Sequence, residues 1–168
     1  MEALMASDRS FSIINVDEEK CVGCRICEIV CSLKKEEKIN PSRSRIRVES
    51  VHSHIDLPVL CRQCRDAPCV EACNFDAIYR NEDNTIIIHS ENCTGCRACV
   101  EACPFAAIFL NPDTDIAVTC DLCGGEPVCV KYCPTGALAY TPWEESLEAK
   151  RGSETALYEK LMHIEKKE

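Results

Sequence analysis

Sixteen cysteines in four groups of four constrain the fold of this 168-residue chain more than any other feature. The first and third groups share the spacing C-x2-C-x2-C-x3-C, whereas the second and fourth widen the middle gap to four and five residues. No cysteine lies outside the groups, so the pattern is an internal repeat that sets the architecture. The groups are Cys21, Cys24, Cys27 and Cys31; Cys61, Cys64, Cys69 and Cys73; Cys93, Cys96, Cys99 and Cys103; and Cys120, Cys123, Cys129 and Cys133.

The spacing is typical of ligands to [4Fe–4S] clusters. Two successive C-x2-C steps turn three sulfurs toward one point, and the x3 step places the fourth sulfur where it ligates the other cluster of a pair. Sixteen thiolates, at four for each cubane, therefore predict four [4Fe–4S] clusters with no thiolate to spare. Gly23 and Gly95 allow tight turns beside an iron atom, and Pro104 and Pro134 redirect the chain after a fourth cysteine.

A disulfide scaffold and structural zinc sites are the alternative explanations of so many cysteines. Disulfides need an oxidising compartment, but residues 1–20 contain neither an apolar export signal nor a twin-arginine pair. Zinc would explain paired C-x2-C units, but not a third cysteine at the same interval with a fourth after it. We therefore expect a cytoplasmic iron–sulfur protein. Its net charge of −9 argues against a nucleic-acid partner, and no apolar run approaches the roughly 20 residues that span a bilayer.

Short alternating segments between the cysteine groups predict a small α+β fold, with a short helix at the end of each group. Asn, Asp and Pro residues between paired segments supply the turn chemistry. The expected strands are residues 11–16 and 137–140, a hairpin of 77–80 with 85–90, and a hairpin of 107–110 with 116–119.

Residues 32–60 and the C-terminal tail differ in character from the cysteine groups. We expect an inserted hairpin or loop at 32–60, where three alternating arginines form a solvated strand edge: Arg43, Arg45 and Arg47. The sequence of the tail predicts a helical extension that begins with a capping box at Thr141, Pro142 and Glu144. Three apolar residues of the tail share one helical face: Leu157, Leu161 and Ile164.

Two stretches resemble a known family. CRQCRDAPCVEAC followed by NFDAI, and CDLCGGEPVCVKYCPTGAL, are similar to the four-cluster ferredoxin-type electron-transfer subunits of molybdenum and tungsten oxidoreductases. That family includes the iron–sulfur subunits of dimethyl sulfoxide reductase-like complexes. It also includes the partners of tungsten aldehyde:ferredoxin oxidoreductase-like enzymes, among them benzoyl-CoA reductases, and the chain resembles this branch more. The resemblance covers residues 11 to about 141, and the chain departs from it at Ser32 and Asn74, where proline often follows the fourth cysteine.

The resemblance implies two ferredoxin-like lobes around four cubane clusters. The first lobe would comprise residues 11–31 and 104–141, the second residues 61–103, with 32–60 as an insertion and 142–168 as a helical tail. Carried over from the family, the four ligand sets would be Cys21, Cys24, Cys27 and Cys133; Cys120, Cys123, Cys129 and Cys31; Cys61, Cys64, Cys69 and Cys103; and Cys93, Cys96, Cys99 and Cys73.

Completeness of the ligand sets predicts electron transfer and not catalysis, because no iron would be left open to a substrate. We expect a relay between a catalytic subunit with a tungsten- or molybdenum-pterin site and another redox partner, which is a further electron-transfer subunit or a ferredoxin. Two alternatives remain open from the sequence. One is a free soluble polyferredoxin carrier, and the other is an electron-transfer subunit of a hydrogenase, formate dehydrogenase or CO dehydrogenase complex.

Overall fold

The computed structural model describes residues 11–51 and 55–145, and these form a small α+β fold of short helices and four two-stranded sheets. All the strands expected from the sequence are confirmed, although most are shorter than their alternating segments. The elements are β1 (Ser12–Val16), η1 (Glu18–Lys20), α1 (Ile26–Glu36), η2 (Pro41–Arg43), β2 (Arg47–Val51), β3 (Ile55–Val59), α2 (Pro68–Glu71), β4 (Ile78–Arg80), β5 (Ile86–Ile88), α3 (Ala98–Ala102), β6 (Phe109–Leu110), β7 (Ala117–Val118), η4 (Leu122–Gly125), α4 (Val128–Lys131) and β8 (Leu138–Pro142).

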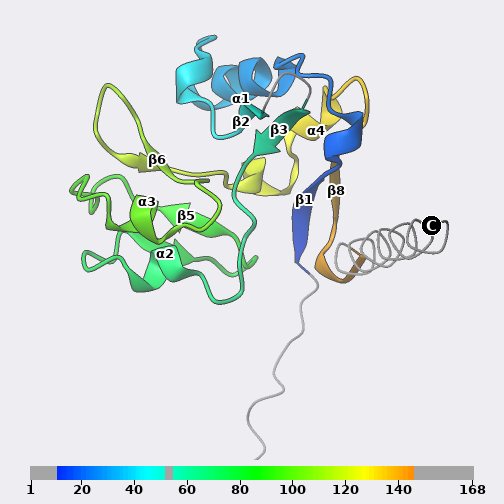
Figure 1. Cartoon of the computed structure of the whole chain (residues 1–168). Coiled ribbons are helices and arrows are strands. Elements are labelled where there is room, and N and C mark those ends of the chain that lie inside the picture. Colours follow the sequence, from blue (N-terminus) through cyan, green and yellow to red (C-terminus); the bar gives the residue numbers. More distant parts are fainter. Residues whose placement is uncertain (1–10, 52–54, 146–168) are drawn as a thin grey trace, which may run out of the picture.

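Strands β1 and β8 join the two ends of the described chain in one antiparallel ladder, which pairs Ser12 with Pro142. Close to this ladder α1 packs against α4, so that the first and fourth cysteine groups lie together (Figure 1). The Phe11 ring stacks on the Trp143 ring with ring centroids 5.2 Å apart. The backbone N–H of Trp143 donates to the Phe11 carbonyl over 2.8 Å.

The expected capping box at Thr141 is wrong, because Thr141 and Pro142 are the last residues of β8. The Thr141 hydroxyl instead accepts a hydrogen bond of 2.6 Å from the Asn15 side chain on β1. Helical backbone begins at Trp143. Cross-strand pairing therefore outweighs the local signal for a helix start. The expected apolar face of the tail lies outside the described residues.

The middle of the chain forms the second set of elements. Hairpins β4–β5 and β6–β7 accompany α2 and α3, which pack against each other (Figure 1). An asparagine begins the turn of each hairpin and accepts backbone hydrogen bonds through its side chain. Asn81 Oδ1 accepts from the N–H groups of Asp83 and Thr85, and Asn111 Oδ1 accepts from that of Asp113. The turn chemistry read from the sequence thus acts through side-chain acceptors.

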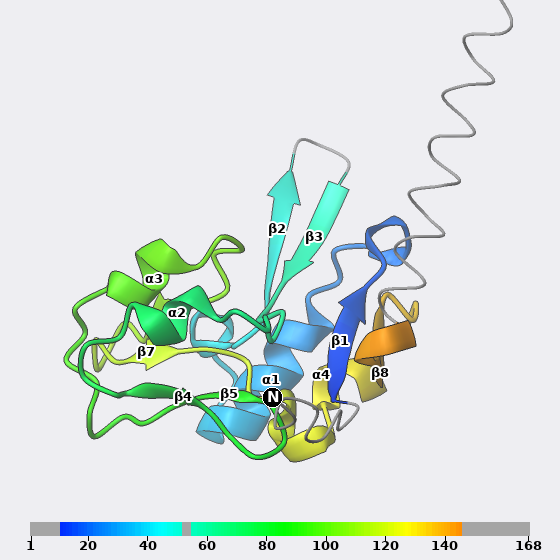
Figure 2. The same cartoon turned by 90° about the horizontal axis from the view of Figure 1, so that it is seen from below.

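Residues 32–60 contain a hairpin, as expected, but α1 continues through residue 31 to Glu36 before the hairpin begins. In Figure 2 strands β2 and β3 extend away from the other elements. The expectation of a solvated arginine edge is wrong, because each arginine has a partner within the chain. Arg43 pairs with Asp113, Arg45 pairs with Glu36 at 3.2 Å, and Arg47 lies 3.6 Å from the centroid of the Phe109 ring. These contacts fasten the insertion to α1 and to the β6–β7 hairpin.

The core is one cluster in which aliphatic side chains pack among the cysteines. The largest aliphatic side chains that are almost completely buried in it are Ile14, Ile46, Leu60, Ile86 and Ile108. Burying such a side chain contributes about 1.5–3 kcal/mol, so the core stabilises the loops that carry the thiols. Among the described residues, no helix has the length and apolar character needed to cross a membrane.

Candidate metal centres

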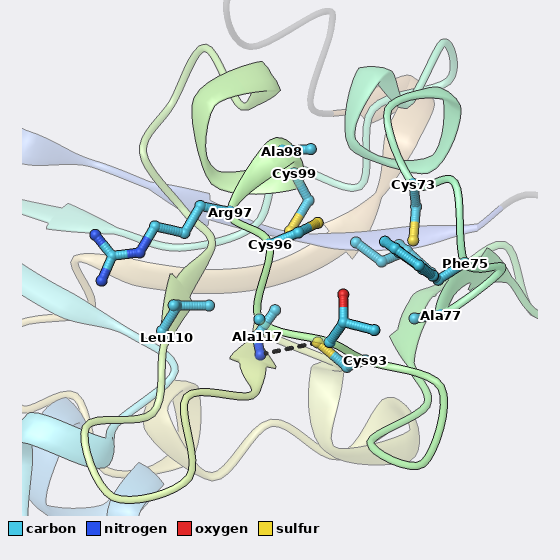
Figure 3. A pocket seen from close by; sticks show the side chains of 13 residues that line it. Cys73, Phe75, Ala77, Cys93, Cys96, Arg97, Ala98, Cys99, Leu110 and Ala117 are labelled. Atoms are coloured by element: carbon cyan, nitrogen blue, oxygen red, sulfur yellow. Dashed lines mark hydrogen bonds between the residues drawn. The ribbon is translucent and has the colours of Figure 1, made fainter.

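Four sulfurs converge on one hollow between α3 and the β4 and β7 strands (Figure 3). The hollow has a volume of about 330 Å³ and is lined by three cysteines of the third group and one of the second: Cys93, Cys96, Cys99 and Cys73. Apolar side chains, among them Ile78, Leu110 and Phe75, complete its wall. Thr94 and Arg97 also line the hollow, and its four thiols are potential metal ligands.

Two further hollows repeat this arrangement, each with a volume of about 320 Å³. In each, three cysteines come from one group and the fourth comes from a group distant in sequence. The first is lined by Cys21, Cys24, Cys27 and Cys133, and the second by Cys61, Cys64, Cys69 and Cys103. All three hollows thus share one pattern of cysteine lining.

The remaining cysteines, Cys31, Cys120, Cys123 and Cys129, lie close together deep in the chain. Burial, followed by the neighbouring thiols of Cys31, Cys123 and Cys27, raises the pKa of Cys129 to about 12. Burial also raises the pKa of Cys120 well above its usual value, with smaller contributions from Cys129, Cys61 and Cys31. The structure thus places four cysteines around each of three hollows, and it places the other four near one another, with Cys27 and Cys61 also close to this last group.

Each cysteine group begins with a left-handed turn. The residue before the second cysteine has a positive φ in all four loops, at Gly23, Gln63, Gly95 and Leu122. Glycine adopts this conformation at the lowest cost. At Gly95 space also favours glycine, because an added Cβ would lie 2.6 Å from the Asp115 carbonyl oxygen, whereas at Gly23 it would meet the carboxylate end of the Asp56 side chain, which can move. The two glycines marked these positions in the sequence, but nothing marked their counterparts Gln63 and Leu122.

Backbone N–H groups point at several of the sulfurs. Four such contacts of 3.3–3.4 Å run from Arg45 to Cys31, Gln63 to Cys61, Ala107 to Cys103 and Ala117 to Cys93. The last of them appears as the dashed line in Figure 3. Hydrogen bonds to a ligand sulfur stabilise its negative charge, and in iron–sulfur proteins they tune the reduction potential.

Burial raises the pKa of several of the metal-free thiols. It is the main cause that raises the pKa of Cys27 to about 12 and that of Cys69 to about 11. Because metals bind thiolates, loading must displace these protons. Among the described residues, no three His, Cys, Asp or Glu side chains have the arrangement of a single-ion site. In a zinc site every sulfur lies about 2.3 Å from one metal, whereas in a cubane each thiolate binds a different iron, so the donor set fits a cubane better.

Some residues that support the cysteine loops have no signature in the sequence. Glu28 is only 4% exposed and accepts a hydrogen bond of 2.7 Å from the Val48 N–H, which fixes α1 against β2. Lys35 of α1 donates to Asp121, beside Cys120, over 2.6 Å. Arg80 donates to the carbonyl of Cys64 and, over 3.3 Å, to that of Arg65. Only their long-range contacts reveal these roles.

Known proteins share these features. A polyferredoxin-like subunit of aliphatic sulfonate oxidoreductase from Pyrococcus furiosus is 43% identical over 86 residues, or 51% of this chain and 50% of that protein. The thiosulfate reductase electron transfer subunit PhsB of Salmonella typhi is 31% identical over 87 residues, which make up 48% of this chain and 45% of that protein. The matches thus span half or less of these relatives.

A chain in the solved active-site complex BamBC of benzoyl coenzyme A reductase with benzoyl-CoA is 29% identical to this one. The comparison covers 86% of this chain and 89% of that chain, with a TM-score of 0.46. Residues 18–34 also match a 4Fe-4S binding domain. Residues 53–142, just over half of the chain, match the 4Fe-4S dicluster domain, and the chain therefore belongs to that family.

Proposed function

We propose that this chain is an electron-transfer subunit that relays single electrons through four [4Fe–4S] clusters. The observation that carries the proposal is the grouping of the sixteen sulfurs. Four cysteines line each of three hollows, and the remaining four cysteines are mutual neighbours. A cubane with four thiolate ligands has no open iron for a substrate and is suited to electron transfer.

The ligand sets follow from this grouping. Cys21, Cys24, Cys27 and Cys133 would hold one cluster, and Cys31, Cys120, Cys123 and Cys129 its neighbour. Cys61, Cys64, Cys69 and Cys103 would hold a third, and Cys73, Cys93, Cys96 and Cys99 the last. Exchange of the fourth cysteine between paired groups supports two ferredoxin-like lobes. Because Leu110 and Ala117 line the hollow of Cys93, we assign residues 104–118 to the second lobe.

A relay needs clusters that lie next to each other, and the electrostatic neighbours of the thiols support such a row. Cys129 interacts with Cys27, which connects the two sets of the first lobe. Cys120 interacts with Cys61, which connects the first lobe to the second. The packing of α2 on α3 brings the two sets of the second lobe together. The row would begin at the Cys21 set and end at the Cys93 set.

The partners we propose are a catalytic subunit with a tungsten- or molybdenum-pterin site and a second electron carrier. The names of the relatives support an oxidoreductase complex, since both are described as subunits of such enzymes. The inserted segment with β2 and β3 supports a docked subunit over a freely diffusing carrier, because its hairpin extends away from the other elements and adds surface there (Figure 2). Reduced thiols in this number favour the cytoplasm.

An anaerobic reductive titration tests the relay. Each cubane accepts one electron, so full reduction should consume about four electrons per chain, with electron paramagnetic resonance signals of interacting reduced clusters. Uptake of about two electrons or fewer by a chain with full iron content would contradict the proposal. Purification from the source under anaerobic conditions then distinguishes a subunit, which retains a pterin-containing partner, from a carrier, which does not.

A further inference from the structure

Gln63 is one of two non-glycine residues in the left-handed turns of the cysteine loops. The residue before the second cysteine is glycine in the first and third groups, with φ of 63° and 69° at Gly23 and Gly95. Gln63 adopts the same left-handed conformation, with φ of 51°. A side chain at such a position costs about 1–2 kcal/mol relative to glycine. Strain of this kind persists only where surrounding contacts enforce it.

The contacts of Gln63 hold it in this left-handed conformation. The residue is completely buried, at 0% exposure. Its Nε2 donates over 2.8 Å to the carbonyl of Cys120, which is 57 positions away in the sequence. Its Oε1 accepts over 2.7 Å from the N–H of Ile86, and its own N–H points at Cys61 Sγ at 3.4 Å. One amide thus connects the loop of the second cysteine group, the β4–β5 hairpin and the loop of the fourth group.

This contact lies where the two proposed lobes meet. Cys61 and Cys120 belong to different ligand sets, yet their thiols are close enough to interact electrostatically. Thr119, next to Cys120, donates over 3.1 Å to the carbonyl of Ala107 in the second lobe. Leu122, the counterpart of Gln63 in the fourth group, is also left-handed and only 3% exposed, but its side chain has no hydrogen-bonding group. Gln63 therefore forms a polar link at this junction, together with Thr119.

We propose that Gln63 is a positioning residue that holds the Cys61 loop against the Cys120 backbone and so sets the reduction potentials of the two clusters at the junction. The proposal rests on the four-cluster function proposed above. Reduction adds a negative charge to a cluster, so the positive end of the buried Nε2–H dipole favours the reduced state. Removing that dipole should lower the potentials at the junction, and placing a carboxylate there should lower them further.

The test is a redox titration of the holoprotein, followed by electron paramagnetic resonance, for Gln63→Met and Gln63→Glu. Met keeps the length of the side chain and loses both hydrogen bonds, whereas Glu in its ionised form keeps the acceptor for Ile86 and loses the donor to Cys120. The matched control is Leu122→Met, which alters a buried side chain on the same backbone conformation without touching a hydrogen bond. Iron content and the guanidinium midpoint of each variant are measured alongside.

We expect two of the four potentials to move to more negative values, further in Gln63→Glu than in Gln63→Met, while the other two stay and Leu122→Met matches the wild type. Unshifted potentials in iron-replete Gln63 variants would overturn the proposal, as would an equal shift of all four. If both variants lose clusters, the potentials of Gln63→Asn test the proposal instead. Asn tolerates the left-handed backbone but is too short to reach Cys120, so it should shift the same two potentials. A wild type without four titrating clusters would instead contradict the proposed function.

Discussion

Gly95→Ala should destabilise the chain by much more than Gly136→Ala, although both glycines have nearly the same backbone. The φ angle is +69° at Gly95 and +68° at Gly136. An alanine in the left-handed region costs about 1–2 kcal/mol at either position. The surroundings differ, because an added Cβ would meet nothing within 4 Å at Gly136 but would lie 2.6 Å from the Asp115 carbonyl oxygen at Gly95.

The clash at Gly95 adds a second contribution. Contacts below 3.0 Å essentially never occur for a real Cβ, and a backbone carbonyl cannot rotate away as a flexible side chain does. Overpacking of this kind costs about 1–3 kcal/mol, so the total for Gly95→Ala is about 2–5 kcal/mol. Asp115 lies near Ala117, whose N–H points at Cys93 Sγ. The strain should therefore fall on the Cys93 ligand set.

The assay compares both variants by anaerobic guanidinium titration, followed by the visible absorbance of the clusters, together with their iron content. We expect Gly136→Ala to retain the wild-type iron content with a modest loss of stability. Gly95→Ala should lose its clusters at a lower guanidinium concentration and be purified with about three quarters of the wild-type iron, since one of four clusters is affected. Equal midpoints and equal iron contents in the two variants would refute the reasoning.

Three further outcomes follow from the contacts around the cysteines. Glu28→Ala leaves the buried N–H of Val48 without an acceptor and should destabilise the holoprotein by about 1–3 kcal/mol. Glu28→Gln keeps an acceptor and should destabilise it less, which a comparison of the guanidinium midpoints of the two variants will test. Arg80→Met removes a cation that donates to the carbonyl of Cys64, so one cluster potential should become more negative in a redox titration, and an unchanged set of potentials would contradict the reasoning. Burial raises the pKa of Cys27 to about 12. Loading of the reduced, metal-free chain with iron and sulfide should therefore release protons and become easier from pH 7 to pH 9. Iron uptake without acidification in a pH-stat experiment would contradict this prediction.

The sequence predicted the strands and the cysteine grouping because both depend on local rules. Alternation and asparagine turns specify hairpins such as β4–β5, and the C-x2-C spacing specifies which sulfurs share a loop. The start of the tail was missed for the opposite reason. Pairing of Pro142 with Ser12 across β1 and β8 extends a strand where the local signal favours a helix.

Side chains that act over long sequence distances could not be predicted. Arg43 read as a solvated residue, but it pairs with Asp113, 70 positions later in the chain. Gln63 carries no motif of its own, and its role depends on Cys120 and Ile86 arriving at the same place. The exchange of fourth cysteines between groups could be expected only from the family resemblance, because spacing alone does not say which group is the partner.

Metal analysis of the anaerobically purified chain tests the central claim most directly. Sixteen thiols grouped as four sets predict about sixteen irons and about sixteen acid-labile sulfides per chain, with no zinc above background. The broad brown absorbance of the clusters should disappear when a chelator and an oxidant remove the iron. A chain that carries zinc, or one whose cysteines are joined as disulfides and bind no sulfide, would contradict the account.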